Sequence, residues 1–305
     1  MGASRFDYAL IVIVGIVWGT SFPAIKVAVE GEGVDPFFLT FLRIGIGALS
    51  GVAFLVIRGR LDLSVFRNPY VWVLGALNAT AFGLQHLGQV YTTASKTALL
   101  VDVNVVFIAL LMVAVFRERM TAPKVLAVFL GVAGVAVLTT RLDPSFVTQG
   151  ELRGDLLVFL AGVVWSVYVV NTKEMLDRGG DYLALSVGVL VTTSVFAAIP
   201  LPWAHVSRPI SSVGWASIVW LGVAVMFPPI AAWTRSIRVV SPTVAAIILL
   251  DEIAVAAALS IGFLGEPFAP FFVLGGVLIV AGMILASLAE RGRATARRTV
   301  PGGRA

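Results

Sequence analysis

Long apolar stretches separated by short polar segments run along almost the whole chain. A helix needs about 20 consecutive apolar residues to cross the hydrocarbon core of a bilayer. The segments between the apolar stretches carry the glycine, proline and charged residues that are typical of loops. The pattern predicts an all-α integral membrane protein with ten transmembrane helices, at about residues 8–29, 37–57, 70–90, 94–115, 122–140, 154–173, 182–200, 213–234, 241–262 and 269–288.

The composition supports this class and excludes several others. Of the 305 residues, 59% are hydrophobic and 13% are charged, with a mean hydropathy of +0.98, which is far from an ordinary soluble domain. The chain has no cysteine, and its only histidines are His86 and His205. A disulfide or a thiol nucleophile is therefore excluded, and no metal, no cofactor and no enzymatic activity are expected. The first stretch is too long for a cleavable signal peptide, so we expect it to stay in the membrane.

Lysine and arginine are distributed unevenly between the predicted loops. With the N-terminus placed in the cytoplasm, sixteen fall on the cytoplasmic side and four on the outer side. Cytoplasmic loops carry such an excess, so both termini are predicted to be cytoplasmic and the protein to lie in the cell (inner) membrane. The same rule explains the net charge of +5 without nucleic acid. Residues 289–305 are expected to form a basic, disordered cytoplasmic tail that can touch anionic lipid.

The two halves of the chain echo each other. Trp18 and Lys26 recur 147 residues later as Trp165 and Lys173. Three further pairs are 148 residues apart: Asn104 with Glu252, Glu118 with Glu266, and Gly134 with Gly282. Each repeat, 8–140 and 154–288, holds five predicted spans, and because five is odd the second repeat must be inverted in the membrane. Inverted repeats are typical of secondary transporters, which bind substrate near the midplane between the halves and work by alternating access.

Specific motifs add a family resemblance that covers nearly the whole chain. The segments "WGTSFPAIK", "WSVYVVNTK", "FLR", "FRERMTAPKVLAVFLGVAGV" and "FLGEPFAPFFVLGGVLIVAGM" resemble the EamA-like branch of the drug/metabolite transporter superfamily. The resemblance implies a fold of two five-helix repeats and the export of compounds such as amino acids, purines or vitamins. Members often have an acidic residue followed by proline in the ninth helix, whereas this chain has Ile253 after its acidic pair, so a helix break at this point does not follow from the resemblance.

The sequence therefore predicts a secondary active transporter that exports small metabolites such as amino acids or related amphipathic compounds. The alternatives are a carrier for nucleobases, sugar-linked metabolites or cationic drugs, and a channel. The absence of a phosphate-binding loop in the sequence indicates that an ion or substrate gradient supplies the energy. The expected partners are a small-molecule substrate and the lipid bilayer, and the protein is expected to be a monomer or a homodimer.

A polar stripe in the third span points to a substrate pathway. Asn78, Phe82, Gln85 and Gln89 share one helical face, and His86 flanks it. Unpaired polar groups in hydrocarbon cost several kcal/mol each, so this face must meet a cavity or hydrogen-bond to other helices. Trp18 and Trp165 lie deeper than an interfacial aromatic belt would place both, which suits substrate stacking or core packing. The predicted substrate-binding set is Trp18, Asn78, Phe82, Gln85, His86, Gln89, Asn104, Trp165, Tyr168 and Trp233. We expect spans 1, 3, 4, 6, 8 and 9 to line the cavity.

Three carboxylates fall near the centre of their spans and are candidates for proton coupling. Asp102 is the first candidate, about eight residues or roughly 12 Å into a ~30 Å core, and Asp251 and Glu252 are the second. A carboxylate at such a depth is costly unless it is paired, hydrated or protonated. The alternatives are an acid hydrogen-bonded to Asn104 or Gln85, and one that receives a substrate ammonium group. Since helix neighbours point about 100° apart, at most one of Asp251 and Glu252 should face the cavity squarely.

The two repeat-related lysines are candidates for structural or gating roles. Lys26 lies near the outer end of its span and Lys173 near the inner end of its span. Each can reach the interface and pair with a loop acid such as Glu30 or Glu174, or can act as a gate at one mouth of the pathway.

Two further features belong to the same group of candidates. Arg43 is deeper than interfacial anchoring requires, so an ion pair is expected, with Glu30, Glu32 or Asp35 as the partner. Pro228 and Pro229 are expected to kink or break the eighth span, as a hinge or as a static kink.

Overall fold

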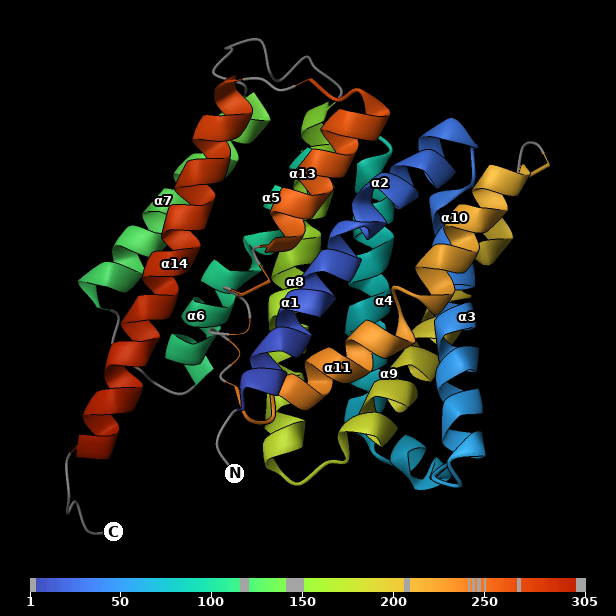
Figure 1. Cartoon of the computed structure of the whole chain (residues 1–305), viewed down its shortest axis with the longest axis horizontal. Helices are drawn as coiled ribbons and strands as arrows, with labels where there is room; N and C mark the ends of the chain where they lie inside the picture. The colour runs from blue at the N-terminus through green and yellow to red at the C-terminus, as the bar shows by residue number, and fades with distance from the viewer. Residues whose placement is uncertain are drawn as a thin grey trace.

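The computed structural model of the chain is a bundle of helices (Figure 1). It describes residues 4–115, 121–140, 151–205, 209–240, 242, 245, 248–249, 251–267 and 270–299, and no strand occurs among them. Four helical stretches are long and apolar enough to span a bilayer, by length and composition: Arg5–Gly31, Pro36–Ile57, Leu152–Asp177 and Ser212–Ser236. The predicted all-helical membrane class is therefore confirmed for the described part of the chain.

The helices fall on the predicted apolar stretches. The first half contains α1 (Arg5–Gly19), α2 (Ser21–Lys26), the π-helical turn η1 (Val27–Gly31), α3 (Pro36–Ile57), the 3-10 turn η2 (Leu63–Arg67), α4 (Pro69–Gln89), α5 (Ala94–Asp102), α6 (Asn104–Val115) and α7 (Ala122–Thr140). The second half contains α8 (Glu151–Asp177), α9 (Tyr182–Ala197), the 3-10 turn η4 (Leu201–Trp203), α10 (Ser212–Val223), α11 (Phe227–Ser236), α13 (Asp251–Leu264) and α14 (Pro270–Thr299).

Side-chain caps explain where several helices begin. Ser4 and Asp7 form a reciprocal capping box at the start of α1. Asp35 accepts hydrogen bonds from the first turn of α3, and Asn68 does the same for α4. Both helices have proline directly after the cap, where the missing N–H has no helical partner to lose. These short polar signals fix the ends of the apolar segments.

Several spans are broken near their middle. The eighth stretch divides into α10 and α11, and Pro228 and Pro229 lie in the first turn of α11, so the predicted break is confirmed. The indole N–H of Trp18 donates to the carbonyl oxygen of Val225 in this gap, at 3.2 Å. The fourth stretch divides at Val103 between α5 and α6, and α13 begins only at Asp251, well inside its predicted span. A membrane tolerates such breaks where protein or a cavity satisfies the freed backbone groups.

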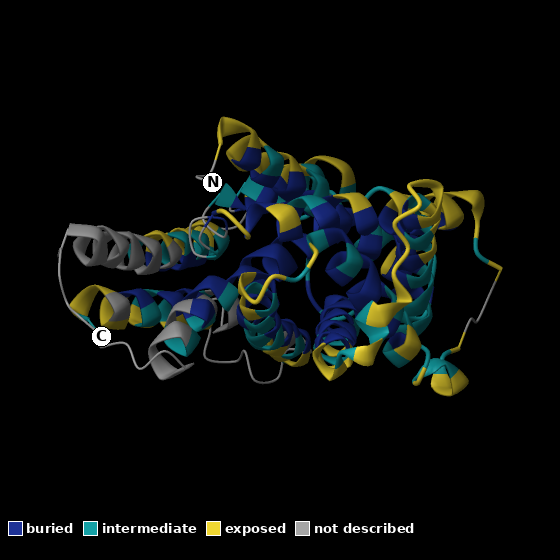
Figure 2. Cartoon of the chain, turned by 90° about the horizontal axis from the view of Figure 1, so that it is seen from below, coloured by how far each residue is buried: buried dark blue, intermediate teal, exposed yellow. Residues whose placement is uncertain are grey.

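The arrangement of side chains is inverted relative to a soluble protein. The interior holds buried polar side chains, among them Arg43, Asn78, Gln85 and His86. Large apolar side chains are exposed on the outside of the bundle, for example on α3, α10 and α14. Figure 2 shows that the exposed positions lie at the periphery and the buried ones in the middle. Lipid solvates apolar surface and leaves polar groups without partners, which accounts for both observations.

The helices pack in pairs that relate the two halves. α4 packs against α8 and α9, and α1 packs against α11 and α13. α3 packs against α9 and α10, while α7 and α14 form a pair at one edge of the bundle (Figure 1). The contact of α4 with α8 joins the third and sixth predicted spans, and the contact of α1 with α11 joins the first and eighth. The repeat relates these two contacts, because it pairs span 3 with span 8 and span 1 with span 6. The core therefore lies between the halves rather than within either one.

Glycines bring α7 and α14 into backbone contact. A Cβ added at Gly134 would lie 2.7 Å from the carbonyl oxygen of Gly275, and one added at Gly282 would lie 2.8 Å from that of Ala127. These two contacts interchange under the 148-residue shift, since Ala127 corresponds to Gly275. The lower-numbered part of each helix meets the higher-numbered part of the other, so these repeat-related helices run antiparallel. Glu118, the other member of the pattern near α7, lies outside the described residues.

The expectation of a disordered tail from residue 289 is wrong for residues 289–299. They continue α14 without a break to Thr299. The segment "AERGRATARRT" contains no proline and is rich in alanine and arginine, which favour helix. The high charge of this segment therefore did not imply a lack of helical structure.

We predict that Gly134→Ala and Gly282→Ala destabilise the protein by similar amounts, about 1–3 kcal/mol each, because the added methyl groups meet backbone atoms that cannot move aside. The measurement is the thermal unfolding midpoint of the purified protein in detergent. Gly262→Ala is the matched control, since nothing lies within 4 Å of a Cβ added there. An equal loss in the control, or no loss in either of the first two variants, would contradict the prediction.

Candidate functional site

A central cavity lies where the broken helices meet. It contains about 940 Å³ of space free of protein atoms, including open solvent. The residues predicted for substrate binding or proton coupling that line it are Trp18, Asn78, Phe82, Gln85, Asp102, Asn104, Trp165, Tyr168, Trp233 and Glu252. They come from all six predicted spans, and Arg43 adds α3 to the lining.

The sequence analysis missed part of the lining. Ser21, Phe22, Val101, Val105, Ile108, Val169, Met226, Ile230 and Leu249 also face the cavity. All but Ser21 are apolar, and an apolar residue in a membrane span carries no signal that separates lining from lipid contact. For the residues that lie beside helix breaks, such as Met226, the neighbouring break is the one sequence feature that could have suggested them.

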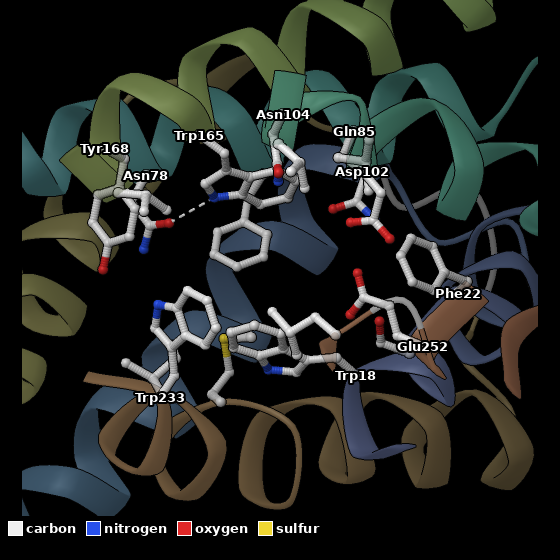
Figure 3. A pocket seen from close by; sticks show the side chains of 18 of the residues that line it. Trp18, Phe22, Asn78, Gln85, Asp102, Asn104, Trp165, Tyr168, Trp233 and Glu252 are labelled. Atoms are coloured by element: carbon white, nitrogen blue, oxygen red, sulfur yellow. Dashed lines mark hydrogen bonds between the residues drawn. The ribbon is translucent and has the colours of Figure 1, made fainter. Parts of the chain in front are cut away.

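Aromatic rings form the middle of the cavity (Figure 3). Phe82 meets Trp165 edge to face, with ring centroids 5.0 Å apart, and Trp18 lies 6.0 Å from Trp233. The indole N–H of Trp165 donates to Oδ1 of Asn78 at 3.1 Å. Since the indole N–H of Trp18 is also bound, to Val225, both side chains offer ring faces rather than donors to a ligand. This region suits an apolar or aromatic group.

Two carboxyl groups form one end of the cavity. Asp102 ends α5 and Glu252 lies in the first turn of α13, and Figure 3 shows their side chains directed toward the same space. Both residues are buried. Buried carboxyl groups that face the same space need a proton or a cation between them to avoid the cost of two uncompensated charges. Asp251 does not line the cavity but packs against Gly15 of α1, in keeping with the expectation that one member of the acidic pair faces inward.

Arg43 is held by a different partner from those expected. Its Nη1 donates to Nε2 of His86 at 2.9 Å, and its guanidinium lies over the Phe82 ring, 5.0 Å from the centroid. Nε2 of His86 is then the acceptor, so Nδ1 carries the proton and donates to Thr40. The expected ion pair of Arg43 with a loop acid is wrong, because those acids have other roles: Asp35 caps α3, Glu30 pairs with Lys26, and Glu32 accepts from the backbone of Ser211.

Two of the predicted substrate-binding residues do not line the cavity. His86 is fully buried within the hydrogen-bond chain from Arg43 to Thr40. Gln89 is also fully buried, and its amide donates to the carbonyl oxygen of Phe22 at 2.6 Å. The polar stripe on α4 therefore has two parts. The first part faces the cavity, and the last turn forms hydrogen bonds to neighbouring helices. Each part matches one of the two possibilities that the sequence left open.

A buried polar network closes the bundle at the end that is uppermost in Figure 1, where α2 ends and α5 and α8 begin. Lys96 and Asp155 form an ion pair with a 2.6 Å contact, and their side chains are only 3% and 1% exposed. Thr92 donates to the second oxygen of Asp155, and Nζ of Lys26 donates to the carbonyl oxygens of Gln89 and Thr92. We call this set, together with Glu266, the upper network.

Glu266 completes the upper network from the second half of the chain. Its carboxylate accepts hydrogen bonds from the backbone N–H of Ala94 and from the N–H and hydroxyl of Ser95, at the start of α5. Anions are favoured at a helix N-terminus, so this contact holds the loop after α13 against α5. Asp155 and Glu266 belong to one half and Lys26, Thr92 and Lys96 to the other, so the upper network ties the halves together.

Each described ion pair at the opposite end has at least one exposed partner, including the pair of Arg235 with the buried Asp7 of α1. Lys173 pairs with Asp177 rather than with Glu174, because Glu174 pairs with Arg178, and all four side chains are at least a quarter exposed. Arg60 and Asp181 form a further exposed pair between the halves. Exposed pairs contribute about 0–1 kcal/mol, whereas breaking a buried pair is costly. Across the described part of the chain, no group of three or more histidine, cysteine or carboxylate side chains could hold a metal ion.

Comparison with known proteins gives the context for this geometry. The family model of the EamA-like transporter family matches residues 5–140 and 152–288. A probable terminal-alkyne amino-acid exporter of Streptantibioticus cattleyicolor is 28% identical over 304 residues, which cover 96% of this chain and 97% of that protein. An uncharacterized transporter of Archaeoglobus fulgidus is 24% identical over 285 residues, covering 91% of this chain and 96% of its own length. A crystal structure of a protein with 22% identity has the same fold, with a TM-score of 0.69 over 94% of this chain and 100% of its own.

We predict that Lys96→Met destabilises the protein by about 3–5 kcal/mol, because it leaves the buried carboxylate of Asp155 without its cation. Adding Asp155→Asn to this variant should recover part of the loss. The measurement is denaturation in mixed micelles. Lys173→Met removes an exposed pair of the same type and should change stability by less than about 1 kcal/mol. Equal losses in the two lysine variants would show that burial of the Lys96 pair carries no special weight.

Proposed function

Because the chain belongs to the EamA-like transporter family, we propose that it is a secondary transporter that exports small amphipathic metabolites of the amino-acid type. The observation that carries this proposal is the central cavity, which combines an aromatic middle with a carboxyl end between the two halves. A relative covering almost the whole chain bears the name of an amino-acid exporter, which supports the substrate class. The family and these relatives are transporters, which argues against an enzyme.

We propose ten transmembrane spans arranged as two inverted repeats, with both termini in the cytoplasm. The antiparallel packing of the repeat-related helices α7 and α14 supports the inversion. α1 begins and α14 ends at the same end of the bundle (Figure 1), as an even number of crossings requires. The sixteen-to-four distribution of basic residues supports a cytoplasmic location of that end, in the cell membrane.

In this topology the upper network lies on the outer side of the membrane. Its Lys96–Asp155 pair is buried on both sides and joins the two halves, while each pair described at the cytoplasmic end has an exposed partner. This asymmetry supports a state that is closed to the outside and takes up substrate from the cytoplasm, as an exporter requires. Alternating access would then require the upper network to separate and the cytoplasmic end to close. A buried network that closes one side of the pathway favours a carrier over a channel.

We propose that a proton gradient drives transport through the carboxyl pair of Asp102 and Glu252. The support is their position in the cavity, where two buried carboxyl groups require a proton or a cation. Asp251 precedes Glu252 in α13 but does not line the cavity. Proton entry would load the pair from the outside, and proton release to the cytoplasm would complete the cycle.

A reporter domain fused after Arg304 should be active only in its cytoplasmic form, because an even number of spans returns the chain to the side on which it began. The measurement uses paired reporters that are active either in the cytoplasm or outside it. A fusion after Ile210, in the loop before α10, should behave in the opposite way, since the topology places that loop outside. Activity of the external reporter at Arg304 would exclude the proposed topology.

In proteoliposomes we expect an imposed pH gradient to accumulate an amino acid such as L-phenylalanine against its own gradient. Asp102→Asn and Glu252→Gln should abolish this accumulation, because each removes a group that carries the proton, and should preserve downhill exchange at saturating substrate. Asp62→Asn, in an exposed loop, is the matched control and should leave both activities unchanged. No flux of any amino acid would contradict the substrate class, and gradient-driven accumulation in both cavity variants would place the coupling elsewhere.

A further inference from the structure

We propose that Asp102 and Glu252 form the subsite for the ammonium group of the substrate, so that the cavity selects amines with an apolar body over the corresponding deaminated acids. This inference rests on the proposed transport function for its biological meaning, but the subsite itself is a binding property that can be measured separately. It specifies which end of an amphipathic substrate meets which end of the cavity.

The first argument is the charge at the carboxyl end of the cavity. Among the described residues, no lysine, arginine or histidine side chain forms an ion pair with Asp102 or Glu252. Arg43 is the only cationic side chain in the described lining, and its guanidinium is bound to His86 and lies over Phe82. Buried carboxylates need a compensating cation or proton. The cavity therefore presents an end that is suited to an incoming positive charge.

The second argument is an acceptor without a partner. Oδ2 of Asp102 is buried and receives no hydrogen bond, although the residue is only 6% exposed and lines the cavity. A buried acceptor without a donor costs free energy, typically more for a charged group than for a neutral one. An ammonium group has three donors in a tetrahedral arrangement and can serve both carboxyl groups at once. Among the described residues, no third histidine, cysteine or carboxylate side chain joins them in a group that could hold a metal ion.

The third argument is the character of the neighbouring wall. The indole N–H groups of Trp18 and Trp165 donate to Val225 and Asn78, so the rings present apolar faces. Phe22 and Phe82 extend this surface (Figure 3 shows Phe22 beside the acids). Aromatic faces also attract cations, which favours an ammonium group near them over a carboxylate. A substrate with one charged amine and an apolar or aromatic body matches both parts of the cavity.

A carboxylate on the substrate is compatible with this orientation. Nε of Arg43 is buried without a hydrogen-bond partner, and the residue belongs to the cavity lining. It is a donor of the right charge for the carboxylate of an amino acid, on a different helix from the acids. The amine is the required group, and the carboxylate is an accepted one.

The test is equilibrium binding to the purified full-length protein in detergent, followed by calorimetry and by tryptophan fluorescence. The three probes share a phenyl body: phenethylamine has only the amine, L-phenylalanine has both groups, and 3-phenylpropionate has only the acid. We expect the first two to bind at least about tenfold more tightly than the third, since a charged hydrogen bond distinguishes them.

Isosteric variants assign the selectivity to the two acids. Asp102→Asn and Glu252→Gln should each weaken binding of the two amines by about tenfold and leave or improve binding of 3-phenylpropionate. Phe82→Leu should weaken all three probes together, because it changes the wall and not the charge. Asp62→Asn should change none of them, and unfolding midpoints close to that of the parent protein will show that each variant is folded.

Three outcomes would overturn the inference: equal binding of amine and acid, an amine preference that survives both acid variants, or no binding of any probe. Flux in proteoliposomes keeps the proposed function separate. Amine-selective binding without any flux contradicts transport and leaves the subsite standing. Transport of a substrate without amine selectivity supports the function and removes the subsite.

Discussion

The structure depends on one constraint, which is that hydrocarbon offers no partner to a polar group. Each unpaired polar group there costs several kcal/mol, so polar side chains in the spans must find partners inside the protein. The chain Arg43 to His86 to Thr40 and the buried pair of Lys96 and Asp155 answer this requirement with contacts between helices. The acids at the cavity meet it only partly, since Oδ2 of Asp102 has no partner. A buried acceptor without a partner marks a place where a ligand can supply the missing hydrogen bond.

The same constraint relates the helix breaks to the cavity. α5 ends beside α6, α10 beside α11, and α13 begins at Asp251, and about half of the lining residues come from the segments around these points, while the others come from α1 and α2 and from the unbroken helices α3, α4 and α8. Broken helices expose backbone groups that lipid cannot satisfy, so the breaks have to lie in the protein interior. They position Asp102 and Glu252 at helix ends, where a carboxyl group can project into open space rather than along a packed helix. Backbone geometry and side-chain chemistry therefore converge on one region.

The two halves are similar in their helices and different in their chemistry. Gly134 and Gly282 make equivalent contacts, whereas the pair of Lys96 and Asp155 is buried on both sides and each described pair at the other end has an exposed partner. In the proposed alternating-access cycle, such a difference in polar contacts would shift the balance between the two access states.

The sequence by itself determined the helical class, the positions of the helices and about half of the cavity lining, because hydrophobic length and polar residues in apolar spans are local signals. It could not separate Gln85 from Gln89 or Asp251 from Glu252, since a small change in position around a helix decides whether a side chain meets a cavity or a neighbour. It also misassigned the partner of Arg43 and could not foresee Lys96 with Asp155, which are far apart in sequence. Only the tertiary structure decides such pairings, because they depend on how helices from distant parts of the chain are placed against each other.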